Sequence, residues 1–122
     1  MDKIINKVVR ELSKIKEIQG ISLFGSQVKG TQKPYSDYDL CIFTKEGTSS
    51  KIKKDILSYA SPKIDISLFS HLPLYVQYRV FKEGKILFQR KNLFLHRLEV
   101  RTLTSYLDFK NLLDRHIEQV LA

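Results

Sequence analysis

The sequence lacks the features that identify disulfide-bonded, zinc-binding, membrane-spanning and secreted proteins. It contains one cysteine, Cys41, which excludes an internal disulfide, and its Cys and His residues lack the spacing of a structural zinc site. No apolar run approaches the roughly 18 residues of a membrane span. The N-terminus carries charged residues among its apolar ones and has no signal-peptide core. We therefore expect a soluble, cytoplasmic protein without covalent or zinc cross-links.

Linkers, internal repeats and low-complexity segments are also missing from the sequence. Its 122 residues are about the usual size of one domain and too few for two separate cores. Hydrophobic residues at 43% and charged residues at 28% are typical of globular proteins, which excludes a disordered or collagen-like chain. We predict a single domain over residues 1–122, with its core over 18–90 and a C-terminal helix over about 91–120.

Acidic residues are fewer than basic ones. The chain has 21 Lys and Arg against 13 Asp and Glu, a net charge of +8. Residues 1–90 carry sixteen basic and nine acidic side chains, whereas residues 91–122 carry five and four. A basic body attracts polyanions of any kind, including nucleic acid and nucleoside triphosphates. Solvated surface lysines explain the same excess, so the charge alone leaves both interpretations open.

Helical and strand patterns alternate along the chain. Apolar residues at spacings of three and four predict an amphipathic helix over residues 3–18, which Gly20 ends. Short apolar or alternating runs predict strands, and polar segments with apolar periodicity predict helices between them: strands over 21–24, 37–44, 63–69 and 85–88, and helices over about 50–60 and 73–81. The fold class is therefore α/β (α+β), a small mixed β-sheet flanked by helices.

The stretch that is most informative about function runs from Leu23 to Leu40. Gly25 and Ser26 follow a predicted strand, where glycine lets the backbone approach a ligand and consecutive N–H groups with the serine hydroxyl can bind an anion. Asp37 and Asp39 are two residues apart on the next predicted strand, so their carboxylates point to the same face. Two carboxylates on one face are typical of a divalent metal site.

Side-chain alternation predicts a third acid at this place. The apolar residues of two strands lie on the face opposite the acids: Leu40, Ile42, Ile64, Ile66 and Leu68. If both apolar sets cover the same core, Asp65 must lie beside Asp37 and Asp39. Three carboxylates would repel one another, whereas two Mg²⁺ ions would neutralise them and bridge the phosphates of a nucleotide.

The pattern GSQVKGTQKPYSDYDL, residues 25–40, resembles the defining motif of the DNA polymerase beta-type nucleotidyltransferase superfamily. More closely, the chain is similar to the minimal nucleotidyltransferase branch, whose members are often paired with HEPN-domain partners in toxin–antitoxin modules. The likeness covers roughly residues 18–90, and Asp65, in KIDISLF, occupies the third acidic position. It implies the polymerase beta-type fold, in keeping with the small mixed sheet predicted above.

The resemblance also implies a role for each acid of the motif. Asp37 and Asp39 would ligate both metal ions, and Asp65 would ligate the catalytic metal and accept the proton of the attacking hydroxyl. All three acids are present in this chain. They are therefore the predicted catalytic and metal-binding residues.

By the same resemblance, Gly25 and Ser26 would hold the triphosphate of the nucleotide. Many family members have arginine directly after this pair, whereas this chain has Gln27. Lys29 follows two positions later and would contact phosphate as a weaker point charge. The predicted nucleotide-binding residues are Gly25, Ser26 and Lys29.

The implied reaction is in-line attack of a hydroxyl on the α-phosphorus of a nucleoside triphosphate, here ATP with two Mg²⁺ ions, which expels pyrophosphate. Positioning and electrostatics carry such chemistry. No second domain is evident that could bind a primer, so we expect a partner to bring the acceptor. By resemblance, the acceptor is a tyrosine hydroxyl of a HEPN-domain toxin, modified with AMP.

Two other functions stay open. The chain could be an antitoxin that neutralises its partner by occlusion while the acids are idle. A nucleic-acid-binding protein fits less well, because the helical tail is nearly neutral and no recognised binding motif is present. The apolar positions of the last helix form more than one stripe, which suits a helix buried on two sides, a homodimer or a partner-binding face.

Overall fold

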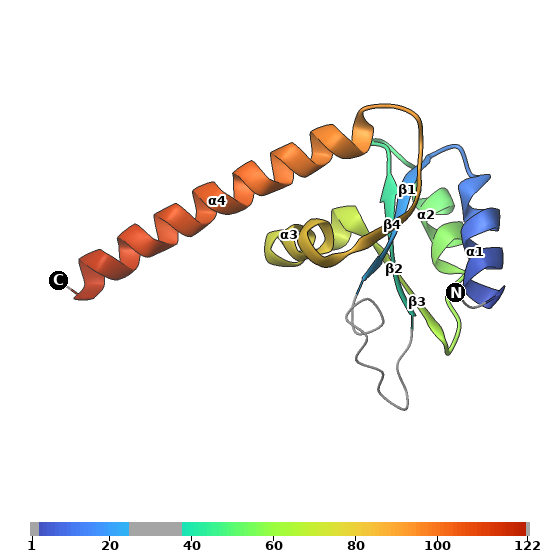
Figure 1. Cartoon of the computed structure of the whole chain (residues 1–122), viewed down its shortest axis with the longest axis horizontal. Helices are drawn as coiled ribbons and strands as arrows, with labels where there is room; N and C mark the ends of the chain where they lie inside the picture. Colours follow the sequence, from blue (N-terminus) through green and yellow to red (C-terminus); the bar gives the residue numbers. More distant parts are fainter. Residues whose placement is uncertain (1–2, 25–37, 122) are drawn as a thin grey trace.

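The computed structural model describes residues 3–24 and 38–121 (Figure 1). The elements follow one another as α1 (Lys3–Ser13), β1 (Ile18–Phe24), β2 (Tyr38–Thr44), α2 (Ser50–Leu57), β3 (Ile64–Leu68), the short 3-10 helix η1 (Phe69–His71), α3 (Leu74–Glu83), β4 (Lys85–Gln89) and α4 (Phe94–Leu121). The strands form a four-stranded sheet in the order β3-β2-β1-β4. Because β2 and β3 are parallel and the other pairs antiparallel, the predicted small mixed sheet is confirmed.

Both faces of the sheet are covered by helices, α1 and α2 on one side and α3 and α4 on the other (Figure 1). Side chains on a strand alternate between the two faces. The face towards α1 and α2 carries the larger apolar cluster, which includes Ile5, Leu12, Ile21, Leu40, Ile42, Ile56 and Ile64. The face towards α3 and α4 carries a second cluster of Cys41, Phe43, Phe69, Val80 and Leu95. Alternate residues of β2 thus belong to different cores.

Helix α1 ends at Ser13, and the sequence prediction of a helix up to residue 18 is wrong. The backbone N–H of Ile15 donates to the carbonyl of Leu12 at 3.0 Å, and that of Ile18 donates to the carbonyl of Ile15 at 3.1 Å, so the chain turns here. Ile18 then starts β1 and is fully buried. A spacing of three residues fits such a turn as well as a helix, and sheet pairing decided between them.

Arg90, which follows β4, holds three carbonyl groups between the end of α1 and the start of β1. Its guanidinium donates to the carbonyl oxygens of Ser13, Ile15 and Ile18 at 3.0, 2.9 and 3.0 Å. A cation at a helix C-terminus also interacts favourably with the helix dipole. Arg90 therefore fastens the turn between α1 and β1 to the far edge of the sheet.

Gly20 lies inside β1, so the prediction that it ends a helix is wrong. A Cβ atom at this position would lie 2.6 Å from Cδ1 of Leu95, far inside van der Waals contact. The glycine is needed because the start of α4 packs directly on the strand. Gly20 does mark a structural constraint, but the constraint is close packing rather than a helix end.

Helix α4 leaves the sheet after its first half and extends away from the rest of the described chain (Figure 1). Leu95 and Thr102 are buried against the sheet side, and the ring of Tyr106 stacks on that of Tyr78 in α3 with centroids 4.0 Å apart. Every residue from Leu107 to Leu121 is exposed. The interpretation that this helix is buried on two sides is therefore wrong for its second half in the isolated chain. Among the described residues, no helix combines the length and apolar character needed to cross a membrane.

Candidate active site

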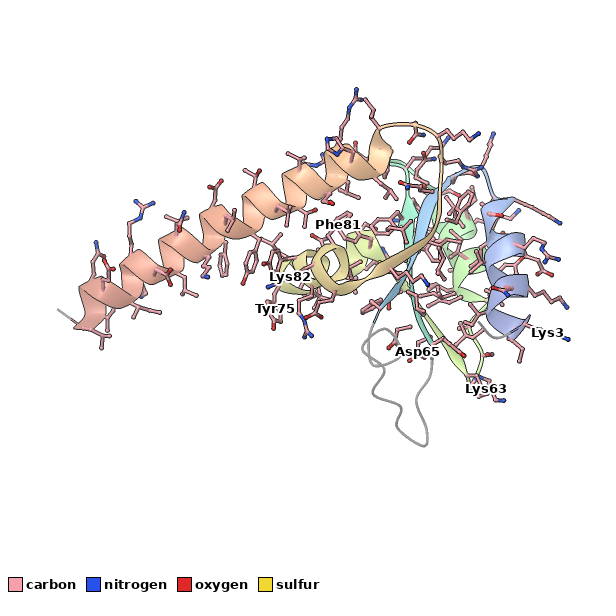
Figure 2. All side chains as sticks on the ribbon, in the orientation of Figure 1. Lys3, Lys63, Asp65, Tyr75, Phe81 and Lys82 are labelled. Atoms are coloured by element: carbon pink, nitrogen blue, oxygen red, sulfur yellow. The ribbon has the colours of Figure 1, made fainter. Side chains whose placement is uncertain are left out.

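Asp39 and Asp65 lie side by side on the parallel strands β2 and β3. The register pairs Asp39 with Asp65 and Leu40 with Ile66. Paired residues of neighbouring strands point to the same face at a Cα separation of about 4.8 Å. The adjacency that side-chain alternation predicted for these two acids is confirmed. Figure 2 shows Asp65 at the end of the sheet close to Lys63.

The two carboxylates point to the face that α3 and α4 cover. Leu40 and Ile64 belong to the opposite core, so their strand neighbours Asp39 and Asp65 must emerge on the α3 side. The register is set where β2 begins, because the N–H of Tyr38 donates to the carbonyl of Lys63 at 2.8 Å. A shift of one residue would bring both acids into the apolar core. Burial of the strands thus fixes the position of the acids.

The local environment suits a divalent cation. Asp65 is exposed and Asp39 is half-buried, at the edge of the apolar layer. Two like charges on adjacent strands repel each other, and a cation that both ligate removes this repulsion. Carboxylate oxygens are the ligands that Mg²⁺ prefers, and this ion keeps several waters, which the exposed side of Asp65 admits. The pair therefore fits part of a magnesium site. Among the described residues, no third His, Cys, Asp or Glu completes a group of three.

Four of the predicted site residues, Gly25, Ser26, Lys29 and Asp37, lie outside the described residues. Their roles in nucleotide and metal binding stay predictions. The same holds for the catalytic roles of Asp39 and Asp65, whose position alone is established. Phe24, which directly precedes Gly25 in the sequence, is paired with Asp39 across β1 and β2.

An aromatic cluster supports the sheet beneath α3. The ring centroids of Phe43 and Phe69 are 4.8 Å apart, and Phe81 lies 5.3 Å from Phe69 and 5.5 Å from Phe43. Cys41 is fully buried in the same cluster, and burial raises the pKa of its thiol far above the ordinary value. The thiol is therefore neutral and inert.

One cavity on the α3 side was not foreseen from the sequence. It has a volume of about 350 Å³ and an apolar floor formed by Phe43, Phe69, Phe94 and Leu98. It lies at the Thr44 end of β2, whereas Asp39 lies near the other end, about 13 Å along the strand from Phe43 at 3.3 Å per residue. No motif could have signalled it, because its walls come from β2, η1, α3 and α4. Its distance from the acids separates it from the candidate site.

The chain was compared with known proteins. A model of the family described as polymerase beta nucleotidyltransferase matches residues 6–93. MJ1547 of Methanocaldococcus jannaschii, which is named as a provisional protein adenylyltransferase, is 33% identical over 72 residues. That match covers 59% of this chain, and the chain spans only 57% of the length of MJ1547.

Solved structures share the fold over nearly the whole chain. A chain of a toxin–antitoxin crystallised with AMP-PNP has a TM-score of 0.70 at 23% identity and covers 98% of this chain and 97% of its own. A chain of the complex between a tri-AMPylated Shewanella oneidensis HEPN toxin and its MNT antitoxin has a TM-score of 0.66 at 20% identity, with the same coverage. At such identities the likeness establishes the fold alone.

The family match begins in α1, includes all four strands and ends just before α4. It therefore contains the complete sheet, with Asp39 and Asp65 next to each other at one end of the parallel pair. Since the match covers well over half of the residues and the solved relatives have the same architecture, this chain belongs to the polymerase beta nucleotidyltransferase family.

Proposed function

We propose that this chain is a magnesium-dependent protein adenylyltransferase, which transfers AMP from ATP to a tyrosine hydroxyl of a HEPN-domain toxin in the cytoplasm and thereby acts as its antitoxin. The observation that carries the proposal is the pairing of Asp39 with Asp65 on parallel strands. Membership of a nucleotidyltransferase family supports nucleotide transfer as the reaction. The naming of MJ1547 as a protein adenylyltransferase supports a protein as the acceptor.

The chemistry assigns separate tasks to the residues of the chain. Asp39 and Asp65, with Asp37, would hold Mg²⁺, which when bound neutralises phosphate charge at the reacting centre. The backbone at Gly25 and the hydroxyl of Ser26 would orient the triphosphate. The exposed carboxylate of Asp65 is accessible to an incoming hydroxyl and would take its proton.

The proposed transfer is balanced in atoms and charge. A bond forms between the tyrosine oxygen and the α-phosphorus, and the bond from the α-phosphorus to the oxygen that bridges it to the β-phosphorus breaks. Pyrophosphate leaves with the electron pair of that bond. The tyrosine proton passes to the carboxylate of Asp65 and then to solvent, so the enzyme returns to its starting state.

The exposed second half of α4, residues 107–121, supports the proposal that this chain binds a protein partner. An isolated helical segment of fifteen residues is marginally stable in water, and most helices in proteins depend on tertiary packing. Between Leu107 and Leu121, seven large apolar side chains would gain from such packing: Leu107, Phe109, Leu112, Leu113, Ile117, Val120 and Leu121. The solved relatives with this fold come from toxin–antitoxin complexes. We infer that a HEPN-domain protein covers this segment.

The test is the transfer of label from ATP to a HEPN-domain protein of the same genome. We expect label from α-³²P-ATP on that protein in the presence of Mg²⁺, and none when EDTA is added. Asp39→Asn and Asp65→Asn should each lower the rate at least 100-fold, because each removes a metal ligand. The matched control is Asp55→Asn, an exposed acid of α2 on the opposite side of the sheet, which should keep the full rate.

The competing function, inhibition by occlusion, makes the opposite prediction for the same variants. If Asp39→Asn and Asp65→Asn still inhibit the toxin as well as the unchanged chain does, binding through α4 is sufficient and catalysis is not the basis of inhibition. If labelling continues in both variants, the acid pair is not the catalytic centre and the proposal is wrong.

A further inference from the structure

The outer side of α1 carries a straight row of cations. Lys3, Lys7 and Arg10 follow at spacings of four and three residues, which places them on one side of the helix over about 10 Å, and Lys14, the first residue after the helix, lines the same groove. All four are exposed, and Figure 2 shows Lys3 on the side of α1 that faces away from the sheet. They line a shallow groove together with Asn6 and Glu11. The row is therefore open to a ligand.

Helix α2 adds to this charge on the same face of the sheet. Lys51 and Lys54 are exposed there and Lys53 is half-buried. Residues 3–14 and α2 together hold seven cations against two acids, Glu11 and Asp55, so most of the net charge of +8 lies on this side. Helix α4, by contrast, contains four basic and four acidic residues. Most of the charge excess of the chain thus lies on one face.

The four cations of this row are available for an external anion. Among residues 3–24 and 38–121, the ion pairs join Arg79 with Glu83 and Arg101 with Glu46, and no carboxylate of the described residues pairs with the row on α1. The acids Asp39 and Asp65 point to the other face of the sheet. The row is therefore separate from the candidate active site and is not needed to hold a nucleotide there.

We propose that the face formed by α1 and α2 binds a nucleic-acid duplex through its phosphates, independently of base sequence. A duplex presents one negative charge per about 1.7 Å, which gives a row of cations many partners along its length. Binding of single strands depends on aromatic side chains that stack on bases, and neither α1 nor α2 contains one. Binding to a lipid surface needs a broad apolar face, whereas the large apolar residues exposed on α1 and α2 are Ile4 and Leu57 alone.

This proposal changes an expectation drawn from the sequence. The sequence disfavours nucleic-acid binding because the helical tail is nearly neutral. The structure places that tail on the other side of the sheet, so its neutrality has no bearing on the face of α1 and α2 (Figure 1). The proposal is also independent of adenylyl transfer, because it uses none of the acids.

The test measures binding of the full chain to a fluorescent 20-base-pair duplex by anisotropy between 50 and 200 mM NaCl. Four phosphate contacts predict a slope of log K against log salt of about −3.5, which is a loss of about 100-fold over this range. Lys7→Gln/Arg10→Gln removes two contacts, so the slope should become shallower by about 2 and the affinity at 50 mM should fall at least tenfold.

The matched control is Lys110→Gln/Arg115→Gln, which removes the same charge from exposed positions of α4. It should bind the duplex like the unchanged chain. Equal losses in both variants would mean that only net charge matters and would overturn the proposal, as would the absence of binding at 50 mM. Tighter binding to a single strand of the same sequence, or to vesicles of phosphatidylserine and phosphatidylcholine, would overturn it too. Duplex DNA and duplex RNA should bind alike.

Discussion

Cys41 illustrates how burial determines the chemistry of a single residue. Its side chain is fully buried between the sheet and α3, and the pKa of the thiol is raised because the thiolate would lose its hydration. In the unfolded chain the thiol ionises near pH 8.5. The folded state therefore keeps a proton that the unfolded state releases, and this difference makes stability depend on pH.

We predict that the free energy of unfolding falls as the pH rises above about 8.5, by up to about 1.4 kcal/mol per pH unit. The contribution is fully present below the unfolded pKa and is lost above it, because ionisation then favours the unfolded chain. Urea denaturation at pH 7.5, 8.5 and 9.5 measures the trend. Cys41→Ala should lose stability at all three values but show a flatter dependence. An equally steep fall in that variant would assign the effect to other groups.

At this scale the sequence predicted the acid pair well. Alternation of apolar and acidic residues was sufficient to place Asp65 next to Asp39, because an error of one residue would have buried a carboxylate. The contacts of Arg90 could not be predicted in the same way. It binds carbonyls that lie 72 to 77 residues earlier in the chain, and no local pattern reports such a partner.

Arg90 also determines how one element, α1, is attached to the sheet. We predict that Arg90→Gln lowers the free energy of unfolding by about 2 kcal/mol, because three carbonyls in the connection from α1 to β1 lose their charged donor. The neighbouring Lys91→Gln, at an exposed position, is the control and should change stability by less than about 0.5 kcal/mol. Chemical denaturation of both variants makes the comparison. Equal stabilities would mean that water replaces the guanidinium at little cost.

The end of α1 is an element boundary that the sequence pattern alone could not locate. Ile15 and Ile18 continue the helical spacing, yet Ile18 belongs to β1, where it pairs with Thr44. Tertiary pairing overrode the local pattern at this point, whereas the positions of β2, β3 and α3 followed from alternation and from Pro73 directly before the helix. Residues 25–37, which contain most of the motif, lie outside the described residues, so that part of the predicted site is untested.

At the scale of the whole molecule, three proposed functional surfaces lie apart from one another. The acid pair lies at one end of the sheet, the basic row lies on α1, and the apolar half of α4 extends away from both (Figure 1). Each surface can therefore be altered without disturbing the others. This separation makes truncation of α4 an informative test of what its second half does.

We predict that a chain ending at Tyr106 keeps the melting temperature of the full chain within about 2 °C, because residues 107–121 are all exposed and bury no core side chain. The same truncation should abolish co-purification with a HEPN-domain protein. A matched full-length variant, Leu113→Lys/Ile117→Lys, should keep the helix and lose the partner. A fall of 5 °C or more on truncation would show that the segment stabilises the body, and conversion from dimer to monomer in light scattering would assign it to a second copy.

The two acids belong to one continuous β2–α2–β3 segment, and the turn before α2 contains Gly47 with a φ of 79° and open space around it. Insertions or deletions at this turn would reach solvent and leave the strand register unchanged. Homologous chains can thus differ in length between the acids while the carboxylates remain opposite each other. Alignments of distant members should accordingly anchor on the strands and allow gaps around Gly47.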